Sequence, residues 1–103
     1  MSKETEDSLL ELTRRIVRSL VDQPELVEVF ADRGDDGEYR ILVQTGPGEL
    51  GQVIGRQGHN LEALQAVVQA CAGKYHRQVA VELLEPEGHF LDTRPAELPG
   101  GRW

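Results

Sequence analysis

Apolar residues recur with a helical period in the first segment of the chain. They lie three or four positions apart, at Leu9, Leu12, Ile16 and Leu20, with Val17 and Val21 beside them. Such a stripe is typical of an amphipathic helix with one buried face. We therefore predict a helix from about Thr5 to Asp22. It ends before Pro24 because the residue that precedes a proline is disfavoured in helical geometry.

Three later stretches alternate apolar and polar residues with the period of two that marks a half-buried strand. They span residues 26–31, 39–45 and 78–84. Asp36-Gly37 lies between the first two, and this pair tolerates the positive φ angles of tight turns. We predict a hairpin with Val27, Val29 and Ala31 on one face of its first strand, and a third strand later in the chain.

Two helices are predicted between the second and third strands. The short one spans about residues 49–54, and the longer one runs from about Asn60 to Tyr75. The apolar face of the longer helix contains Leu61, Leu64, Val68, Cys71 and Tyr75. The predicted order is helix, strand, strand, helix, helix, strand. The fold class is therefore α+β, with a three-stranded sheet covered on one face by helices.

The periodic pattern ends after Glu85. Residues 86–103 contain prolines and glycines without any repeating apolar spacing. We therefore expect one domain at residues 1–85, which begins with a short flexible N-terminus, and a flexible tail at residues 86–103.

The composition narrows the classes of function. The chain has 103 residues, with 11 Lys and Arg against 18 Asp and Glu, for a net charge of −7. This length is enough for one small domain and too short for a doubly wound dinucleotide fold or a TIM barrel. The acidic balance argues against unspecific adhesion to duplex DNA or to anionic membranes.

The cellular location is also constrained. Cys71 is the single cysteine, so neither an intramolecular disulfide nor a cysteine-based zinc site is expected. The acidic N-terminus differs from a signal peptide, and the aliphatic runs are too short to span a membrane. We expect a cytoplasmic protein that does not contact the membrane.

The junction of the two later helices carries the candidate chemistry. Gly55 and Gly58 flank Arg56 and Gln57 there. Glycines without Cβ atoms allow a sharp turn and the close approach of a sugar–phosphate chain. The start of the next helix favours an anion, and Arg56 adds a cation. Between residues 50 and 81 three basic residues stand against one acid, so this segment is locally positive.

We hypothesise that an extended single strand binds at this junction, with its phosphates on the glycine loop. Val53, Ile54 and Leu61 would line an aliphatic groove for the bases. His59 follows the loop, where contact with a phosphate or base and a solvated helix start are both open. The alternative is a plain helical hairpin in which the glycines only make a turn.

Residues 53–58, which read V-I-G-R-Q-G, resemble the V-I-G-x-x-G signature of KH domains. The predicted order of elements is similar to the prokaryotic type II KH arrangement. Residues 16–22, followed by Pro24 and residues 27–29, resemble the single-domain bacterial KhpA family, and the resemblance covers about Leu9 to Glu85. Residues 60–65 also resemble the KH domain of Jag (KhpB) proteins, which carry further domains.

The resemblance implies an RNA-binding protein and RNA chaperone with effects on cell division, cell shape and envelope growth. It implies a homodimer, or a heterodimer with a KhpB/Jag-type protein. It also implies that the loop Gly55–Gly58 holds the backbone of about four unpaired nucleotides. Gly48 stands where the family usually has an acid, so the short helix is expected to be weakly capped.

Other motifs in the chain are not expected to form a cofactor, metal or catalytic site. Residues 46–51 match G-x-G-x-x-G, but the following helix is broken and the chain is too short for a dinucleotide site. His76 and His89 lack partners at ligand spacing, so neither a metal nor another cofactor is expected. Cys71 is expected in the core. No base–nucleophile pair is evident, so we expect no enzymatic activity.

Two further interpretations concern the surface. Arg14, Arg15 and Arg18 are expected to form a solvated helix face offset by Glu11 and Asp22. The acidic surface supports a competing hypothesis of function, in which the chain is a protein-interaction module that kept the KH fold and lost RNA binding.

Overall fold

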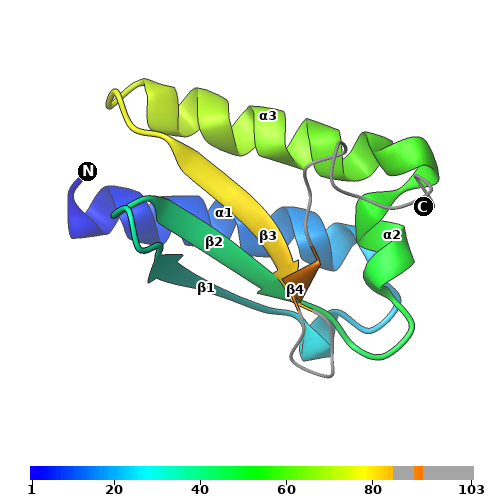
Figure 1. Ribbon diagram of the computed structural model, residues 1–103. Helices are drawn as coiled ribbons and strands as arrows, with labels where there is room; N and C mark the ends of the chain where they lie inside the picture. Colours follow the sequence, from blue (N-terminus) through cyan, green and yellow to red (C-terminus); the bar gives the residue numbers. More distant parts are fainter. Residues whose placement is uncertain (85–89, 92–103) are drawn as a thin grey trace.

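The structure is a computed structural model that describes residues 1–84 and 90–91. Figure 1 shows its elements, which are α1 (Lys3–Leu20), η1 (Pro24–Leu26), β1 (Glu28–Arg33), β2 (Tyr39–Gln44), α2 (Leu50–Ile54), η2 (Arg56–Gly58), α3 (His59–Gly73), β3 (Val79–Leu84) and β4 (Phe90–Leu91). The predicted α+β fold class and its order α-β-β-α-α-β are confirmed. The short 3-10 helix η1 precedes β1, so that strand begins two residues later than predicted.

The sheet is mixed, with the strand order β1-β2-β3-β4. β1 and β2 form the predicted antiparallel hairpin, and β2 and β3 are parallel. The parallel pair requires a long crossover, which α2 and α3 supply. The two-residue strand β4 pairs antiparallel with β3 and extends the three predicted strands. It lies in the segment predicted to be a flexible tail, whose other residues fall outside the described part of the chain.

The helices α1 and α3 pack on the same face of the sheet, α1 over β1 and α3 over β3 (Figure 1). The strand residues that face the helices are buried, and they are Val29, Tyr39, Ile41, Val43, Val79, Val81 and Leu83. The helices contribute Leu9, Thr13, Val17, Leu61, Leu64, Val68 and Ala72 to the same core. Ala31 was predicted on the buried face, but it is exposed on the edge strand β1.

The buried face of α3 differs from the prediction at its C-terminal end. Cys71 is exposed and Tyr75 lies beyond the helix, so placing them on the buried face was wrong. Ala72 is buried instead. The four-residue steps from Leu64 to Val68 and Ala72 keep the stripe over the sheet, whereas a three-residue step to Cys71 turns it back by about 60°.

The buried face of α1 is also rotated from the predicted stripe. Thr13 and Val17 are fully buried, while Ile16 and Leu20 are only half-buried. Thr13 is tolerated in the core because its hydroxyl donates to the carbonyl oxygen of Leu9 at 2.8 Å. The half-buried residues of α1 therefore remain at the surface, beside α3.

Candidate nucleic-acid interface

The glycine loop joins α2 to α3 through three residues of left-handed or otherwise positive φ. Gly55 has a φ of 78° and Gly58 a φ of 79°, and Gln57 between them has a φ of 58°. Positive φ is unfavourable for residues that carry a Cβ atom. The two glycines thus permit the sharp turn that the sequence predicted.

Gly55 also makes a close packing contact. A Cβ atom added at Gly55 would lie 2.5 Å from Cγ of Asn60. Asn60 is held there because its side-chain amide donates to the carbonyl oxygen of Gln52 at 3.0 Å, within α2. The sequence did not predict this role of Asn60, because the bond joins residues that are eight positions apart in different helices.

The tip of the loop presents hydrogen-bond donors outward. The N–H of Gly55 donates to Gly51 and that of Gly58 to Gly55, at 2.8 and 3.1 Å. The N–H groups of Arg56 and Gln57 have no acceptor within residues 1–84 and 90–91. Both of these side chains are exposed. The tip therefore combines two available backbone donors with a mobile guanidinium group, a set that suits a phosphate.

The apolar residues around the loop lie deeper than the predicted groove wall. Val53 is 0 %, Ile54 4 % and Leu61 9 % exposed. These three side chains belong to the hydrophobic core and support the loop from below. His59, in contrast, is exposed at the start of α3.

An apolar groove of about 170 Å³ lies between α1 and α3. Its lining residues are Ile16, Leu20, Asn60, Ala63, Leu64 and Val67. Val67 is 43 % exposed there, which is high for a valine. The groove starts at Asn60, so it reaches the C-terminal side of the glycine loop.

Glu49 anchors the start of α2. Its side chain is buried and accepts from the backbone N–H groups of Asp22 and Gln23, at 2.6 and 3.1 Å. No side chain caps α2, as the glycine at position 48 led us to expect. The glutamate therefore joins the end of α1 to the beginning of α2 and fixes the position of the glycine loop.

The arginine cluster on α1 is only partly a solvated face. Arg14 donates to Glu11 at 2.7 Å and to the carbonyl oxygen of Val29 at 3.1 Å, so it binds the outer edge of β1. Arg15 and Arg18 are exposed, as expected. Asp22, which was expected to offset these arginines, accepts a hydrogen bond from Gln52 at 3.3 Å.

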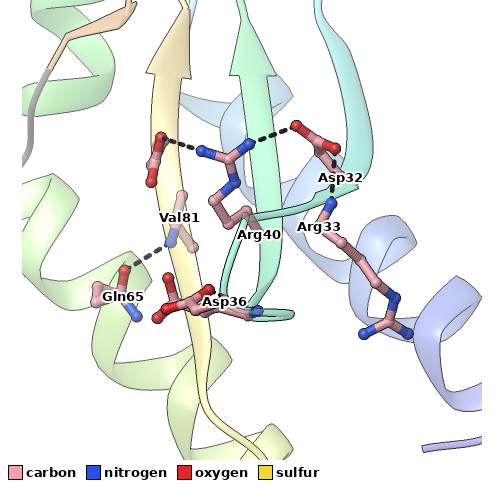
Figure 2. Close-up of polar contacts among 8 residues, drawn as sticks. Asp32, Arg33, Asp36, Arg40, Gln65 and Val81 are labelled. Carbon is pink, nitrogen blue, oxygen red and sulfur yellow. Dashed lines mark hydrogen bonds and ion pairs between the residues drawn. The ribbon is translucent and has the colours of Figure 1, made fainter.

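The sheet face opposite the helices presents paired charges. Arg40 lies at its centre, and its guanidinium group contacts Asp32 on β1 and Glu82 on β3 (Figure 2). Among β1, β2 and β3, Phe30 is the exposed aromatic residue. One ring among neutralised charges makes a poor platform for stacked bases.

The described residues contain neither a cluster of metal-binding side chains nor a membrane-spanning helix. Residues 1–84 and 90–91 contain no group of three or more His, Cys, Asp or Glu side chains placed to hold a metal ion. None of their helices is both long enough and apolar enough to cross a membrane.

Comparisons with known proteins agree on one family. The family described as "KhpA/KhpB, KH domain" matches residues 11–83. "RNA-binding protein KhpA" of Clostridium perfringens is 38% identical over 74 residues, which cover 72% of this chain and 97% of the relative. The protein of the same name from Halalkalibacterium halodurans is 35% identical, over 72% of this chain and 96% of its own length.

A more distant relative extends the range of organisms. "RNA-binding protein KhpA" of Borreliella burgdorferi is 32% identical over 76 residues, or 74% of this chain and 92% of its own. No solved structure matches the chain. The matched family is non-enzymatic. By the extent of these matches, together with the loop and the order of its elements, the chain belongs to the KhpA/KhpB family of KH domains.

Proposed function

We propose that the chain binds single-stranded RNA at the glycine loop, weakly and with little sequence preference. The observation that carries the proposal is the loop tip, where the free N–H groups of Arg56 and Gln57 adjoin the Arg56 guanidinium group. Several relatives bear the name RNA-binding protein, which supports RNA as the ligand. A single loop makes few phosphate contacts, so low affinity is expected.

The path of the bases follows from what lies on each side of α3. Toward α1 the surface is almost wholly apolar. Toward β3 it includes a strand edge on which Gln65 and Gln69 bond the backbone groups of Val79 and Val81, and the Leu83 position beyond them offers backbone groups that base edges can pair with. We therefore place the phosphates on the loop and the bases along α3 on its β3 side, with Leu61 beneath them.

A titration with a charge-matched control tests this function. The variant Arg56→Asp/Gln57→Asp repels phosphate, and we expect its affinity for a random-sequence RNA octamer to fall by about tenfold or more. The control Lys74→Asp/Gln78→Asp makes the same charge change at exposed positions beyond the far end of α3. We expect that control to bind within about twofold of the unmodified chain. Equal losses in both variants, or none in either, would reject the loop as the site.

A second candidate function is pairing with another KH protein, either a second copy or a KhpB/Jag-type partner. The groove between α1 and α3 favours it, because Val67, Ile16 and Leu20 leave an apolar surface beside α3. We expect Val67→Glu to reduce the sedimenting mass toward that of the monomer, while Ala70→Glu on the exposed face of α3 leaves it unchanged. Identical sedimentation of both variants and the unmodified chain would contradict this use of the groove.

RNA chaperone activity and a cytoplasmic location belong to the same proposal, and they rest on the family resemblance. Pull-down with and without nuclease separates RNA binding from a pure interaction module. Partners that survive both nuclease and the two Asp substitutions would favour the interaction module.

A further inference from the structure

The helix α3 closes the outer edge of β3 with two glutamines. The Gln65 side chain donates to the carbonyl oxygen of Val79 at 2.8 Å and accepts from the N–H of Val81 at 2.8 Å (Figure 2). Gln69 accepts from the N–H of Val79 at 3.0 Å and donates to Arg77 at 2.9 Å. These side chains satisfy backbone groups that would otherwise form an open sheet edge.

The spacing of these bonds shows how far along β3 the glutamines of α3 can satisfy the strand edge. A four-residue step along α3 advances about 6 Å, and a two-residue step along β3 advances about 6.6 Å. Gln69 and Gln65 therefore serve successive positions of β3, and the next position on α3 is Leu61. Leucine cannot form such bonds, so the edge at Leu83 is left open, one turn of α3 from the glycine loop.

The strand β4 occupies this open part of the edge. Leu91 lies opposite Leu83, and Phe90 lies opposite Leu84. Figure 1 shows β4 at the end of β3, on the side away from β2. Leu83 has the same orientation as Val79 and Val81, because alternate residues of a strand point their backbone groups to the same edge. The chain's own later segment thus fills the place that the helix leaves.

We propose that β4 is an intramolecular competitor of RNA. It takes the strand edge beside Leu61 that the bases would use, so RNA must displace it. This inference rests on the proposed function, since it assumes that the bases run along α3 toward β3.

The sequence around β4 supports competition. The family match ends at residue 83, so β4 lies outside the matched domain. Residues 85–92 carry Glu85, Glu87 and Asp92 and no Lys or Arg. The net charge of this stretch is negative, so it offers no cationic side chain that would attract a phosphate backbone.

The fraction of molecules in which β4 is docked determines how much the competition lowers the apparent affinity for RNA. The apparent Kd equals the intrinsic Kd divided by the fraction of molecules whose site is open. A segment docked in about four fifths of the molecules therefore weakens RNA binding about fivefold.

The test uses Leu91→Pro in the full chain. Proline has no N–H to offer β3, so it removes the pairing at Leu83 while the net charge stays the same. Ala96→Pro, five residues further along, is the matched control. The probe is a labelled random-sequence RNA octamer, and amide hydrogen exchange at Leu83 reports whether β4 is docked before RNA is added.

We expect Leu91→Pro to bind RNA about fivefold more tightly, with faster amide exchange at Leu83, while Ala96→Pro matches the unmodified chain. Equal affinity of Leu91→Pro and the unmodified chain would overturn the competition. If Arg56→Asp/Gln57→Asp still weakens octamer binding by about tenfold or more, the proposed function stands without the competition. Failure of both the unmodified chain and Leu91→Pro to bind the octamer would overturn the proposed function and the competition together.

Discussion

Gly55 and Gly58 share a positive φ but differ in ψ, which is 174° at Gly55 and 10° at Gly58, and in environment. Both have a φ close to 80°. A Cβ atom at Gly55 would collide with Asn60, whereas a Cβ atom at Gly58 meets nothing within 4 Å. The first glycine thus serves both turn and packing, and the second serves the turn and leaves room for a ligand.

This difference predicts unequal effects of alanine. Gly58→Ala should lower the free energy of unfolding by about 1 kcal/mol, the cost of a left-handed conformation with a Cβ atom. Gly55→Ala should lower it by about 2–4 kcal/mol, because a φ of 78° with a ψ of 174° is open essentially to glycine alone and overpacking against Asn60 adds to that strain. Chemical denaturation measures both values. A larger loss at Gly58 than at Gly55 would contradict the packing role of Asn60.

Tyr39 is a buried polar residue at the start of β2, next to the hairpin turn. Its hydroxyl group has no hydrogen-bond partner among the described residues, and the Arg33 guanidinium group lies 5.5 Å from the centre of its ring. Burial, and secondarily the Glu6 carboxylate, raises the pKa of the Tyr39 hydroxyl above its ordinary value of 10.0, while Arg33 opposes the shift. The neutral form is therefore favoured in the folded chain.

The raised pKa makes stability depend on alkaline pH. The unfolded chain releases the Tyr39 proton first, so stability is complete below about pH 10 and is lost as the pH rises through the folded-state pKa. Tyr39→Phe should remove the loss of stability at alkaline pH that Tyr39 ionisation causes. It should also raise the free energy of unfolding at neutral pH by up to about 1 kcal/mol, because a buried hydroxyl group without a partner is removed. Denaturation series from pH 7 to pH 11 measure both effects. Destabilisation by Phe at neutral pH would show that the hydroxyl group has a partner.

At the scale of elements, the contact between α3 and β3 depends on Gln65 and Gln69. Replacing Gln65 with Leu leaves the N–H of Val81 and the carbonyl of Val79 without partners on a partly buried edge. We expect the free energy of unfolding to fall by about 1–3 kcal/mol. Glu62→Leu, an exposed position on the same helix, should change it by less than about 0.5 kcal/mol. Similar values for the two variants would show that water replaces the glutamine bonds.

At the scale of the whole molecule, the net charge of −7 hides an uneven distribution. The segment from residue 50 to residue 81, which holds the glycine loop and α3, has three basic residues and the single acid Glu62, and the other acids lie outside it. Of the two acids nearest the loop, Glu62 is exposed in the first turn of α3, whereas Glu49 is buried on the backbone of residues 22 and 23. The surface near the loop is therefore less acidic than the sequence total indicates.

The order of elements and the glycine loop could be predicted because both follow from local patterns. Period-two stretches, a helical stripe and two glycines are each readable within a few residues. The buried faces could not be predicted fully, because the packing angle of α1 and α3 on the sheet decides whether Thr13 or Leu12, and Ala72 or Cys71, points inward.

Long-range polar contacts also could not be predicted from the sequence. Glu49, Asn60 and Gln65 bind backbone groups that lie eight or more residues away, so no local pattern marks them. The strand β4 is two residues long, and a strand that short has no detectable alternation. The depth of Val53 and Ile54 likewise depends on how α2 lies on the core.

Mapping RNA contacts by amide chemical shifts tests the central claim most directly. A titration of the full chain with a random-sequence RNA octamer should shift the amides of residues 55–60 most strongly. The amides of Leu61 and Leu83 should follow, since the bases are proposed to run along α3 toward β3. Shifts concentrated on Phe30, Arg40 and Glu82, on the opposite face of the sheet, with residues 55–60 unmoved, would contradict RNA binding by the glycine loop.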